Sequence, residues 1–353
     1  IRSRLNNKAN YIAPAIQFLK DGMNSRFTYK LRYIAIHKDN QLQDDLFRAS
    51  VLWHYKLRQI ISSAYRDHLL TSIIMVKDSN KSLIDFYLTF TVTENEIEKL
   101  TALTVEFIED FESFLQNNTE DQLTPYIFEA VTDINVLSSI LCPGYKNPAV
   151  RIYSKPEGWG YMGDYELEVK DSQQVLNAEF LPALPNITNI SGISLLPEAM
   201  MATSGTSIVV MHLQPLNFHN NETEFLERII DGEISSASIG SSDTSEEYIN
   251  HFNEIINSPL NNYLFEVRFL SDIHQNIPKL LKSEIEKFYA SNKPIVNCTF
   301  QKGLFDNLFS IDQNMSLSRL SFMKSKEEII PIFRFPVPET ELILVVPYQY
   351  SNL

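Results

Sequence analysis

The sequence predicts an α+β protein with two α/β sandwiches of the ferredoxin-like type, whose antiparallel or mixed sheets are joined by a proline-rich β linker. Three observations predict this class. The expected elements before residue 146 follow the order strand, helix, strand, strand, helix, strand; strands and helices alternate again after residue 206; and prolines gather between these stretches. The predicted domains are 1–146, a linker or small β insertion at 147–205, and 206–353, which ends in a C-terminal strand or linker segment.

Hydrophobic periodicity predicts the elements of the first domain. Phe27, Tyr29 and Leu31 alternate with polar residues, which is typical of a half-buried strand. Thr93 and Glu96 have the spacing of a capping box, which indicates the start of a helix with one apolar face. The expected strands are 27–36, 69–76, 83–92 and 126–131, and the expected helices are 44–68, one from 93 onward, and 133–141.

The later elements are predicted in the same way. Thr244 and Glu247 form a second capping box before an amphipathic helix. The serine-rich residues 231–245 are expected to form a mobile loop, and Trp159 is expected to pack beneath a turn. No residue-level repeat relates the halves, so a duplication rests on element order alone. The expected strands are 150–153, 165–169, 207–214, 263–270 and 295–300, with a further helix at 277–289.

Composition excludes several functional classes. With 353 residues, 44% of them hydrophobic and 21% charged, the chain can bury a substantial core. Only 10 glycines occur beside 22 Phe and 16 Tyr, which argues against a phosphate-cradling enzyme. The formal charge of -14 disfavours direct binding of nucleic acid, because such binding normally depends on Lys and Arg.

The compartment is predicted from cysteine usage and hydropathy. Cys142 and Cys298 are too few and too far apart for a disulfide framework or a zinc site, and they fit a reducing compartment. No apolar run approaches the ~18 residues of a membrane span. Ile1 is followed by basic residues without an apolar stretch, which is neither a signal peptide nor a usual natural start, so a fragment or trimmed chain is expected. We therefore expect a cytoplasmic, acidic protein.

Catalytic motifs are absent from the sequence. It contains no P-loop, GxSxG, HExxH, EF-hand or GxGxxG pattern, and the nearest approach to a phosphate loop, residues 204–207, lacks the lysine. His212 and His219, with Glu222 and Glu224 nearby, are interpreted as ordinary strand-end and loop polarity, not as metal ligands. We therefore assign no catalytic, cofactor-binding or metal-binding residue, and expect no cofactor.

An acidic helix surface is also predicted. The carboxylates lie mainly opposite the apolar stripe of the helix that follows residue 93, so a solvated face is favoured, with an electrostatic docking surface as the alternative. The set comprises Glu94, Glu96, Glu98, Glu106, Glu109, Asp110 and Glu112.

The C-terminal part resembles a known family. Leu317–Met323 is followed by Ser325-Lys326-Glu327-Glu328-Ile329-Ile330-Pro331-Ile332 and then by Phe333-Arg334-Phe335-Pro336-Val337-Pro338. This resembles the segment before the motor of HerA/FtsK-type ATPases, including conjugation and type IV secretion ATPases, in which a short Ser/Thr-Glu-Glu helix leads into a Phe-Arg-Leu/Phe-Pro element. The specific part is under 20 residues. The alternative is a proline-terminated edge strand at 333–338 in an unrelated fold.

The resemblance implies an assembly role. Residues 206–338 would correspond to the α/β domain before the motor, and the motor with its P-loop would lie beyond Leu353. The implied function is a non-catalytic assembly or docking region of a nucleic-acid-translocating ATPase, which contacts other copies of the chain and partner proteins. A stand-alone scaffold or adaptor of a bacterial multi-protein complex is the alternative. An enzyme with a dispersed site is the third hypothesis, with Glu157, Asp164, His212, His219 and Glu222 as candidates.

Overall fold

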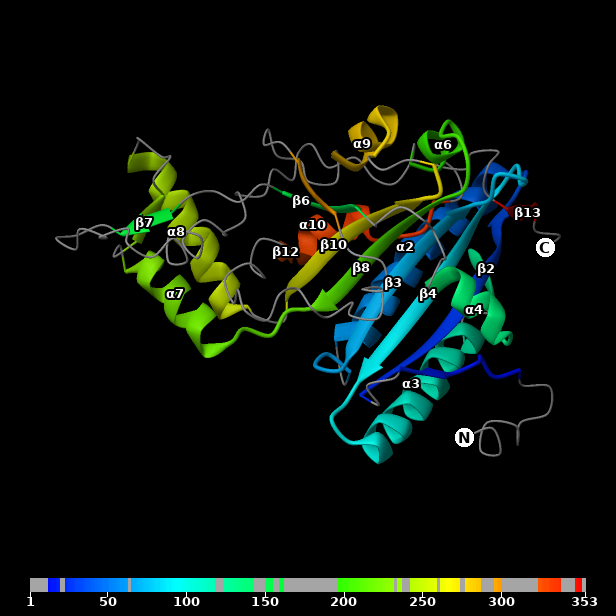
Figure 1. Ribbon diagram of the computed structural model, residues 1–353, viewed down its shortest axis with the longest axis horizontal. Helices are drawn as coiled ribbons and strands as arrows, with labels where there is room; N and C mark the ends of the chain where they lie inside the picture. The colour runs from blue at the N-terminus through cyan, green and yellow to red at the C-terminus, as the bar shows by residue number, and fades with distance from the viewer. Residues whose placement is uncertain are drawn as a thin grey trace.

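The computed structural model has a mixed α+β architecture built on one large sheet (Figure 1). It describes residues 12–19, 23–62, 65–117, 124–141, 150–154, 159–161, 196–231, 234–236, 242–258, 261–273, 277–286, 295–299, 323–337 and 347–350. The strands of the large sheet are β1 (Gln17–Phe18), β2 (Asn24–Ile36), β3 (Leu69–Lys77), β4 (Ile84–Thr93), β5 (Tyr126–Ala130), β6 (Val150–Ser154), β8 (Ser207–Pro215), β10 (Asn262–Ser271), β11 (Ile295–Thr299), β12 (Met323–Ser325) and β13 (Tyr348–Tyr350).

Eight helices accompany the sheet in the described part of the chain. They are α2 (Asn40–Ser62), α3 (Ile97–Asn117), α4 (Ile134–Leu141), α6 (Leu196–Met201), α7 (Asn220–Ile230), α8 (Ser242–Asn257), α9 (Lys279–Glu286) and α10 (Lys326–Ile332). A separate two-stranded sheet pairs β7 (Trp159–Tyr161) with β9 (Ile234–Ser236).

The main path through the large sheet is β1-β2-β4-β3-β8-β10-β6-β11, with β5 and β13 paired to β2 and β12 paired to β10. The strands along this path pair antiparallel, whereas β13 runs parallel to β2. The order within the first half is β5-β2-β4-β3, and the order within the second half is β11-β6-β10-β8. In each half, the strand that follows the first helix lies at the edge that meets the other half: β3 after α2, and β8 after α6.

The arrangement of two separate sandwiches is not confirmed, because the halves share one sheet. Strand β3 pairs with β8 over the full stretch from Thr71 opposite Leu213 to Lys77 opposite Ser207. Strand β6 lies inside the predicted 147–205 segment and pairs with both β10 and β11. The sequence could not indicate the pairing of β3 with β8. Both strands are apolar, and the sequence of a buried strand at the edge of a sheet does not differ from that of a buried strand in its middle.

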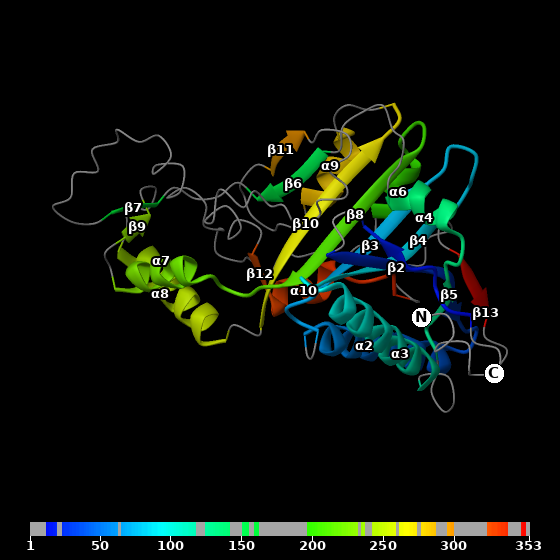
Figure 2. The same cartoon turned by 60° about the horizontal axis from the view of Figure 1, so that its bottom comes forward.

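One face of the sheet forms the main core. Its residues include Phe27, Ile73, Met211 and Val267, which lie on β2, β3, β8 and β10. They belong to one buried cluster with residues of α2, α3, α6, α9 and α10. Helices α2 and α3 lie side by side across the first half (Figure 2). Helix α4 packs on the opposite face through Leu137 and Ile140.

That opposite face carries a polar row across five strands. Thr28 of β2 and Thr89 of β4 are hydrogen-bonded through their hydroxyl groups (3.0 Å), and Ser72 of β3 is hydrogen-bonded to His212 of β8 (2.7 Å). Glu266 of β10 lies opposite His212 and forms an ion pair with Arg268. These side chains are buried, so their polar groups depend on such partners.

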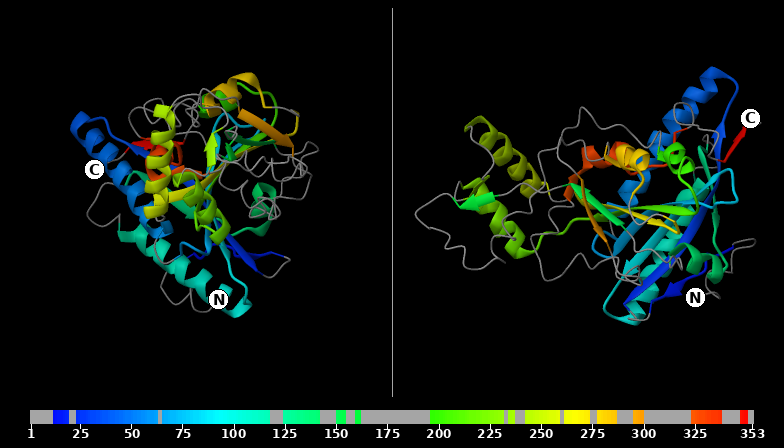
Figure 3. Two further views of the ribbon diagram at one scale, coloured as in Figure 1. Left: turned by 90° about the vertical axis from the view of Figure 1, so that its left-hand side faces the viewer. Right: turned by 45° about the horizontal axis from the view of Figure 1, so that its top comes forward.

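The connection between β8 and β10 forms a lobe beside the sheet. It contains α7, β9 and α8, which lie to one side of the large sheet (Figure 3). Trp159 lies on β7, which pairs with β9 and so joins this lobe. Residues 234–236 form a strand and α8 begins at Ser242, so part of the stretch predicted as a loop at 231–245 is regular structure. The predicted strand at 165–169 lies outside the described residues.

Helix boundaries also differ from the predictions. Helix α2 begins at Asn40 because the Asp39 carboxylate accepts hydrogen bonds from the amides of Gln41 (2.9 Å) and Leu42, and it ends at Ser62 instead of His68. Thr93 is the last residue of β4 and donates to Asn24 (2.6 Å), so it does not cap α3. The start of α2 and the role of Thr93 are therefore set by polar partners that periodicity does not detect.

We predict that the shared sheet couples the stability of the two halves. Met211→Ala in β8 removes a fully buried side chain opposite Ile73 and Val267, and should lower the free energy of unfolding by about 2–5 kcal/mol. Urea unfolding followed by Trp53 fluorescence, in a Trp159→Phe background, measures this from the first half. Gln214→Ala on the same strand should change it by less than about 0.5 kcal/mol. A Trp53 transition that Met211→Ala leaves unmoved would contradict the coupling.

Candidate functional site: the docked C-terminal segment

Residues 323–337, here called the docked segment, carry the family resemblance and are packed into the fold. Strand β12 pairs with β10, with Met323 opposite Leu264 and Ser325 opposite Asn262. Helix α10 follows directly. Ser325 is its N-cap and forms a capping box with Glu328, in which each side chain receives the other residue's amide hydrogen bond. The Ser-x-x-Glu spacing of the motif therefore serves to start this helix.

A buried ion pair reinforces the start of α10. Lys324 donates to Oε1 of Glu328 (2.7 Å), while Oε2 of Glu328 accepts from the amide of Ser325 (2.8 Å). Both side chains are more than nine-tenths buried. Each oxygen of the Glu328 carboxylate thus has a partner, which offsets the cost of placing its charge inside the protein.

Phe335 anchors the docked segment in an aromatic cluster of the first half. Its ring is fully buried and lies 5.3 Å from the ring of Phe128 and 5.7 Å from that of Tyr126. Trp53 of α2 stacks on Phe128 at 5.4 Å and meets Phe335 edge-on at 6.0 Å. The Tyr126 hydroxyl donates to the carbonyl of Pro336 (3.1 Å). Aromatic pairs of this kind contribute beyond their buried area.

His54 of α2 completes this attachment. The amide of Phe335 donates to His54 Nε2 (2.9 Å), so the other ring nitrogen, Nδ1, carries the proton and donates to the Ser50 carbonyl (2.7 Å). Burial, helped by the positive charges of Arg58 and Arg334, lowers the pKa of His54 from 6.5 to about 3. The ring is therefore neutral, as its acceptor role requires.

The candidate residues of a dispersed enzyme site are not brought together in the described structure. His212 is buried on β8 beside Ser72, whereas His219 is exposed at the start of α7. Glu222 is buried and accepts from the amide of His219 (2.8 Å), which makes it part of a helix start. Glu157 and Asp164 lie outside the described residues.

The stretch nearest to a phosphate loop forms a tight turn. Gly205 has a φ of +74°, and a Cβ at this position would clash with Ile273 and Asp272. The amide of Thr206 donates to a carboxylate oxygen of Asp272 (3.0 Å). A phosphate-binding loop needs free backbone amides, and here the carboxylate of Asp272 already occupies one of them. We therefore do not assign phosphate binding to this turn.

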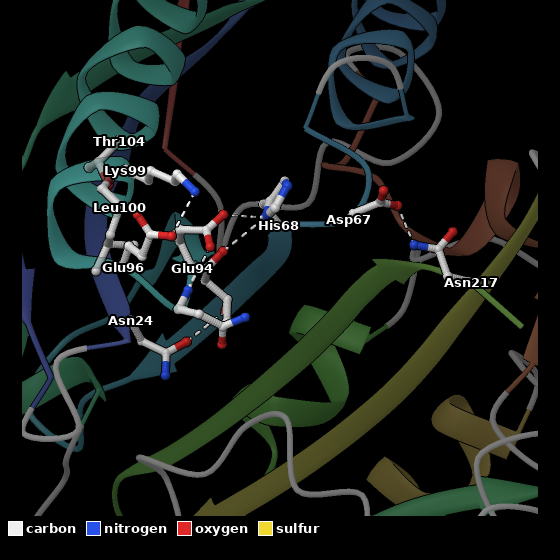
Figure 4. Close-up of polar contacts among 11 residues, drawn as sticks. Asn24, Asp67, His68, Glu94, Glu96, Lys99, Leu100, Thr104 and Asn217 are labelled. Atoms are coloured by element: carbon white, nitrogen blue, oxygen red, sulfur yellow. Dashed lines mark hydrogen bonds and ion pairs between the residues drawn. The ribbon is translucent and has the colours of Figure 1, made fainter. Parts of the chain in front are cut away.

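The acidic residues of α3 form mainly a solvated face, as predicted. Glu98, Glu106 and Glu109 are exposed, and so is Glu96 just before the helix. Ile97, which the apolar periodicity predicts to be on the buried face of this helix, is also exposed, contrary to that prediction. Figure 4 shows the start of this face, where Glu96 pairs with Lys99 (2.7 Å) and Glu94 lies beside His68 (3.4 Å). The same view shows Asp67 accepting from Asn217, a contact between the two halves.

A pocket of about 630 Å³ lies on the face that α4 covers, between α4 and the β3–β4 turn. Asp85 on its wall accepts from Lys30 and Lys81 (both 2.8 Å). Burial acts to raise the pKa of Asp85, but these two lysines outweigh it and hold the pKa below its usual value. Lys30 also lies over the ring of Tyr87. Asp85, Lys30 and Lys81 pair with one another in this pocket, and the sequence motifs assign it no ligand.

Other classes of site were sought in the described residues. No group of three or more His, Cys, Asp and Glu side chains there could hold a metal ion. None of the helices in these residues combines the length and apolar character of a membrane span. A comparison of the sequence with protein-family models finds none that matches it, and a comparison with curated proteins likewise finds no match.

The docked segment's contacts with α2 could not be predicted from the sequence. Phe335 and His54 lie 281 positions apart in the sequence, and no sequence motif contains both of them. The Ser-x-x-Glu capping box was detectable, whereas the alternative of an edge strand at 333–338 is wrong for 333–337, which form no strand. Pro338 lies outside the described residues.

We predict that lowering the pH destabilises the protein through His54. Because its pKa is about 3 in the folded state and 6.5 in the unfolded state, the stability it provides is complete above pH 6.5 and is lost as the pH falls toward 3. Between about pH 7 and about pH 5.5 the loss should be about 1.2 kcal/mol. His54→Gln should lack this component, and His37→Gln, at a partly exposed position, should keep it. Urea unfolding at both pH values measures it; equal slopes for wild type and His54→Gln would refute the assignment.

We further predict that Phe335 contributes most of the anchoring. Phe335→Ala should lower the free energy of unfolding by about 3–5 kcal/mol, because it empties a fully buried ring site. Ile330→Ala in the same segment removes a side chain that is 39% exposed, and should cost less than about 0.5 kcal/mol. Chemical denaturation of the three proteins tests this, and similar costs for the two variants would argue against a specific anchor.

Proposed function

We propose that this chain is the non-catalytic assembly and docking region of a nucleic-acid-translocating ATPase of the HerA/FtsK type. The observation that carries the proposal is the docked segment. Its Ser-Lys-Glu-Glu stretch forms a capped helix, and its Phe-Arg-Phe-Pro stretch is attached to α2 through Phe335 and His54. The two parts of the resemblance thus form one structural unit, which is what a connection between an assembly region and a motor requires.

The path of the chain after the docked segment supports the same role. Strand β13 pairs in parallel with β2, with Tyr348 opposite Ile34, and the amide of Ile34 donates to the Pro347 carbonyl (3.0 Å). A motor connected after residue 350 would receive its chain from a position fixed to the sheet. Movements of such a motor would therefore be transmitted to the large sheet, because no long flexible linker would separate the two.

We also propose that each half is a ferredoxin-like unit. The strand orders β5-β2-β4-β3 and β11-β6-β10-β8 support this, because both place the first strand beside the third and fourth. In this proposal the second unit begins at β6, within the 147–205 segment, and the lobe of α7, β9 and α8 is an insertion in its hairpin. The units would be duplicates joined through their second strands.

The proposed setting is a cytoplasmic complex in bacteria. Partners would be further copies of this chain and other proteins, and the net charge of -14 makes direct nucleic-acid contact unfavourable. In the proposed complex, contact with nucleic acid and hydrolysis of ATP belong to the motor. The chain described here supplies the attachment surfaces.

The coding sequence that follows Leu353 tests this proposal most directly. We expect a Gly-x-x-x-x-Gly-Lys-Ser/Thr motif downstream in the same reading frame. Sedimentation of the protein that includes this motor should then show assembly into a ring that ATP strengthens. A stop codon close to Leu353 would refute the proposal and support the stand-alone scaffold, which should copurify with a fixed heterologous partner.

A further inference from the structure

The pocket between α4 and the β3–β4 turn holds two cations and one anion at its centre. Each oxygen of the Asp85 carboxylate accepts from one ammonium group, Oδ1 from Lys30 and Oδ2 from Lys81, both at 2.8 Å. Asp85 stays ionised, because the effect of burial is outweighed by the two lysines and its pKa lies below the usual value. Within the described residues neither ammonium has a second anionic partner. One positive charge is therefore left over at this point.

The two ammonium groups can be bridged by a second anion. A lysine ammonium has three N–H donors, and Asp85 takes one from each side chain. Another carboxylate has the same distance between its oxygens as that of Asp85, so it can reach the same two ammonium groups from the solvent side. The Lys30 and Lys81 side chains are 29% and 52% exposed. Their remaining donors are thus accessible to a ligand.

The other acidic residues of the pocket limit the charge that a ligand can carry. Glu129 pairs with Arg32 (3.3 Å). Asp78 and Asp133 accept from the amides of Asn80 (3.0 Å) and Asn135 (2.8 Å), so they keep their negative charges beside the pocket. These charges would repel a group with two negative charges, such as phosphate near neutral pH. A single carboxylate matches the one positive charge that is left over at the centre.

Much of the remaining wall is apolar. Ile140 of α4, Ile208 of β8 and Val131 belong to the buried cluster on this face of the sheet, and Val76 packs against that cluster. Val136 of α4 adds a side chain that is 38% exposed. The volume of about 630 Å³ lies within the range of small-molecule sites, which combine apolar walls with a few polar groups that orient the ligand.

We propose that this pocket binds a small monocarboxylate with an apolar body, such as a medium-chain fatty acid. The carboxylate bridges Lys30 and Lys81, and the alkyl chain lies against Ile208 and the side of α4 that carries Val136 and Ile140. Charged hydrogen bonds from the two lysines orient the ligand, and each methylene group that is buried adds affinity. The site rests on these lining residues and does not depend on the function proposed above.

Isothermal titration calorimetry of the full chain with sodium octanoate tests the site, at an ionic strength set with chloride. Binding should be saturable, and each methylene group added between butanoate and octanoate should strengthen it about threefold, because more apolar surface is buried. Octylamine has the same chain and the opposite charge, and should bind at least about tenfold more weakly than octanoate. Inorganic phosphate, which lacks the apolar body and carries more charge, should also bind more weakly than octanoate.

Variants of the chain separate the two parts of the site. Lys81→Met should weaken octanoate binding at least about tenfold, because a charged hydrogen bond is lost. Lys99→Met on α3, where the side chain is 64% exposed, is the control and should bind as wild type does. Val136→Asn should reduce the gain per methylene group, and it provides the second test should Lys81→Met fail to fold.

Three results would overturn the proposal. They are equal octanoate binding by wild type and Lys81→Met, equal binding of octanoate and octylamine by wild type, and the absence of saturable octanoate binding. The downstream coding sequence plays no part in these outcomes, so the pocket and the function proposed above can fail separately.

Discussion

The antiparallel pairing of β3 with β8 is the constraint on which the rest of the structure depends. Seven residue pairs, from Thr71 with Leu213 to Lys77 with Ser207, join strands that belong to different halves of the chain. Because backbone groups inside a protein must be hydrogen-bonded, this seam cannot open without exposing both strands. It also makes the two helical layers continuous, so that Trp53 and Leu281 belong to one core.

The docked segment adds a second connection between the halves, of a different kind. It begins on β10 through backbone pairing and ends on α2 through Phe335 and His54. Backbone pairing sets the register, while the buried ring and the neutral imidazole determine where the segment stops. The buried Glu328 carboxylate and the buried His54 imidazole each have partners that suit their charge state.

The sequence predicted individual elements far better than their assembly. Alternation in β2 and the apolar stripe of α3 were sufficient to locate these elements, because periodicity records which face is buried. Capping residues were less reliable: Thr93 looks like an N-cap but bonds to Asn24, whereas the Ser325 box is real. The pairing of β3 with β8 and the bond from Phe335 to His54 depend on contacts between distant residues. Such contacts leave no local pattern.

The shared sheet also determines how other chains can attach. A strand that is paired on both sides has no unpaired amides or carbonyls to offer to a neighbour. Because β3 and β8 satisfy each other, the halves meet at positions that would otherwise be exposed edges. Growth of the sheet by a strand from another molecule is thereby excluded at the middle of the path, between β3 and β8. The sheet shared by the two halves thus removes two edges that could pair with strands of other molecules.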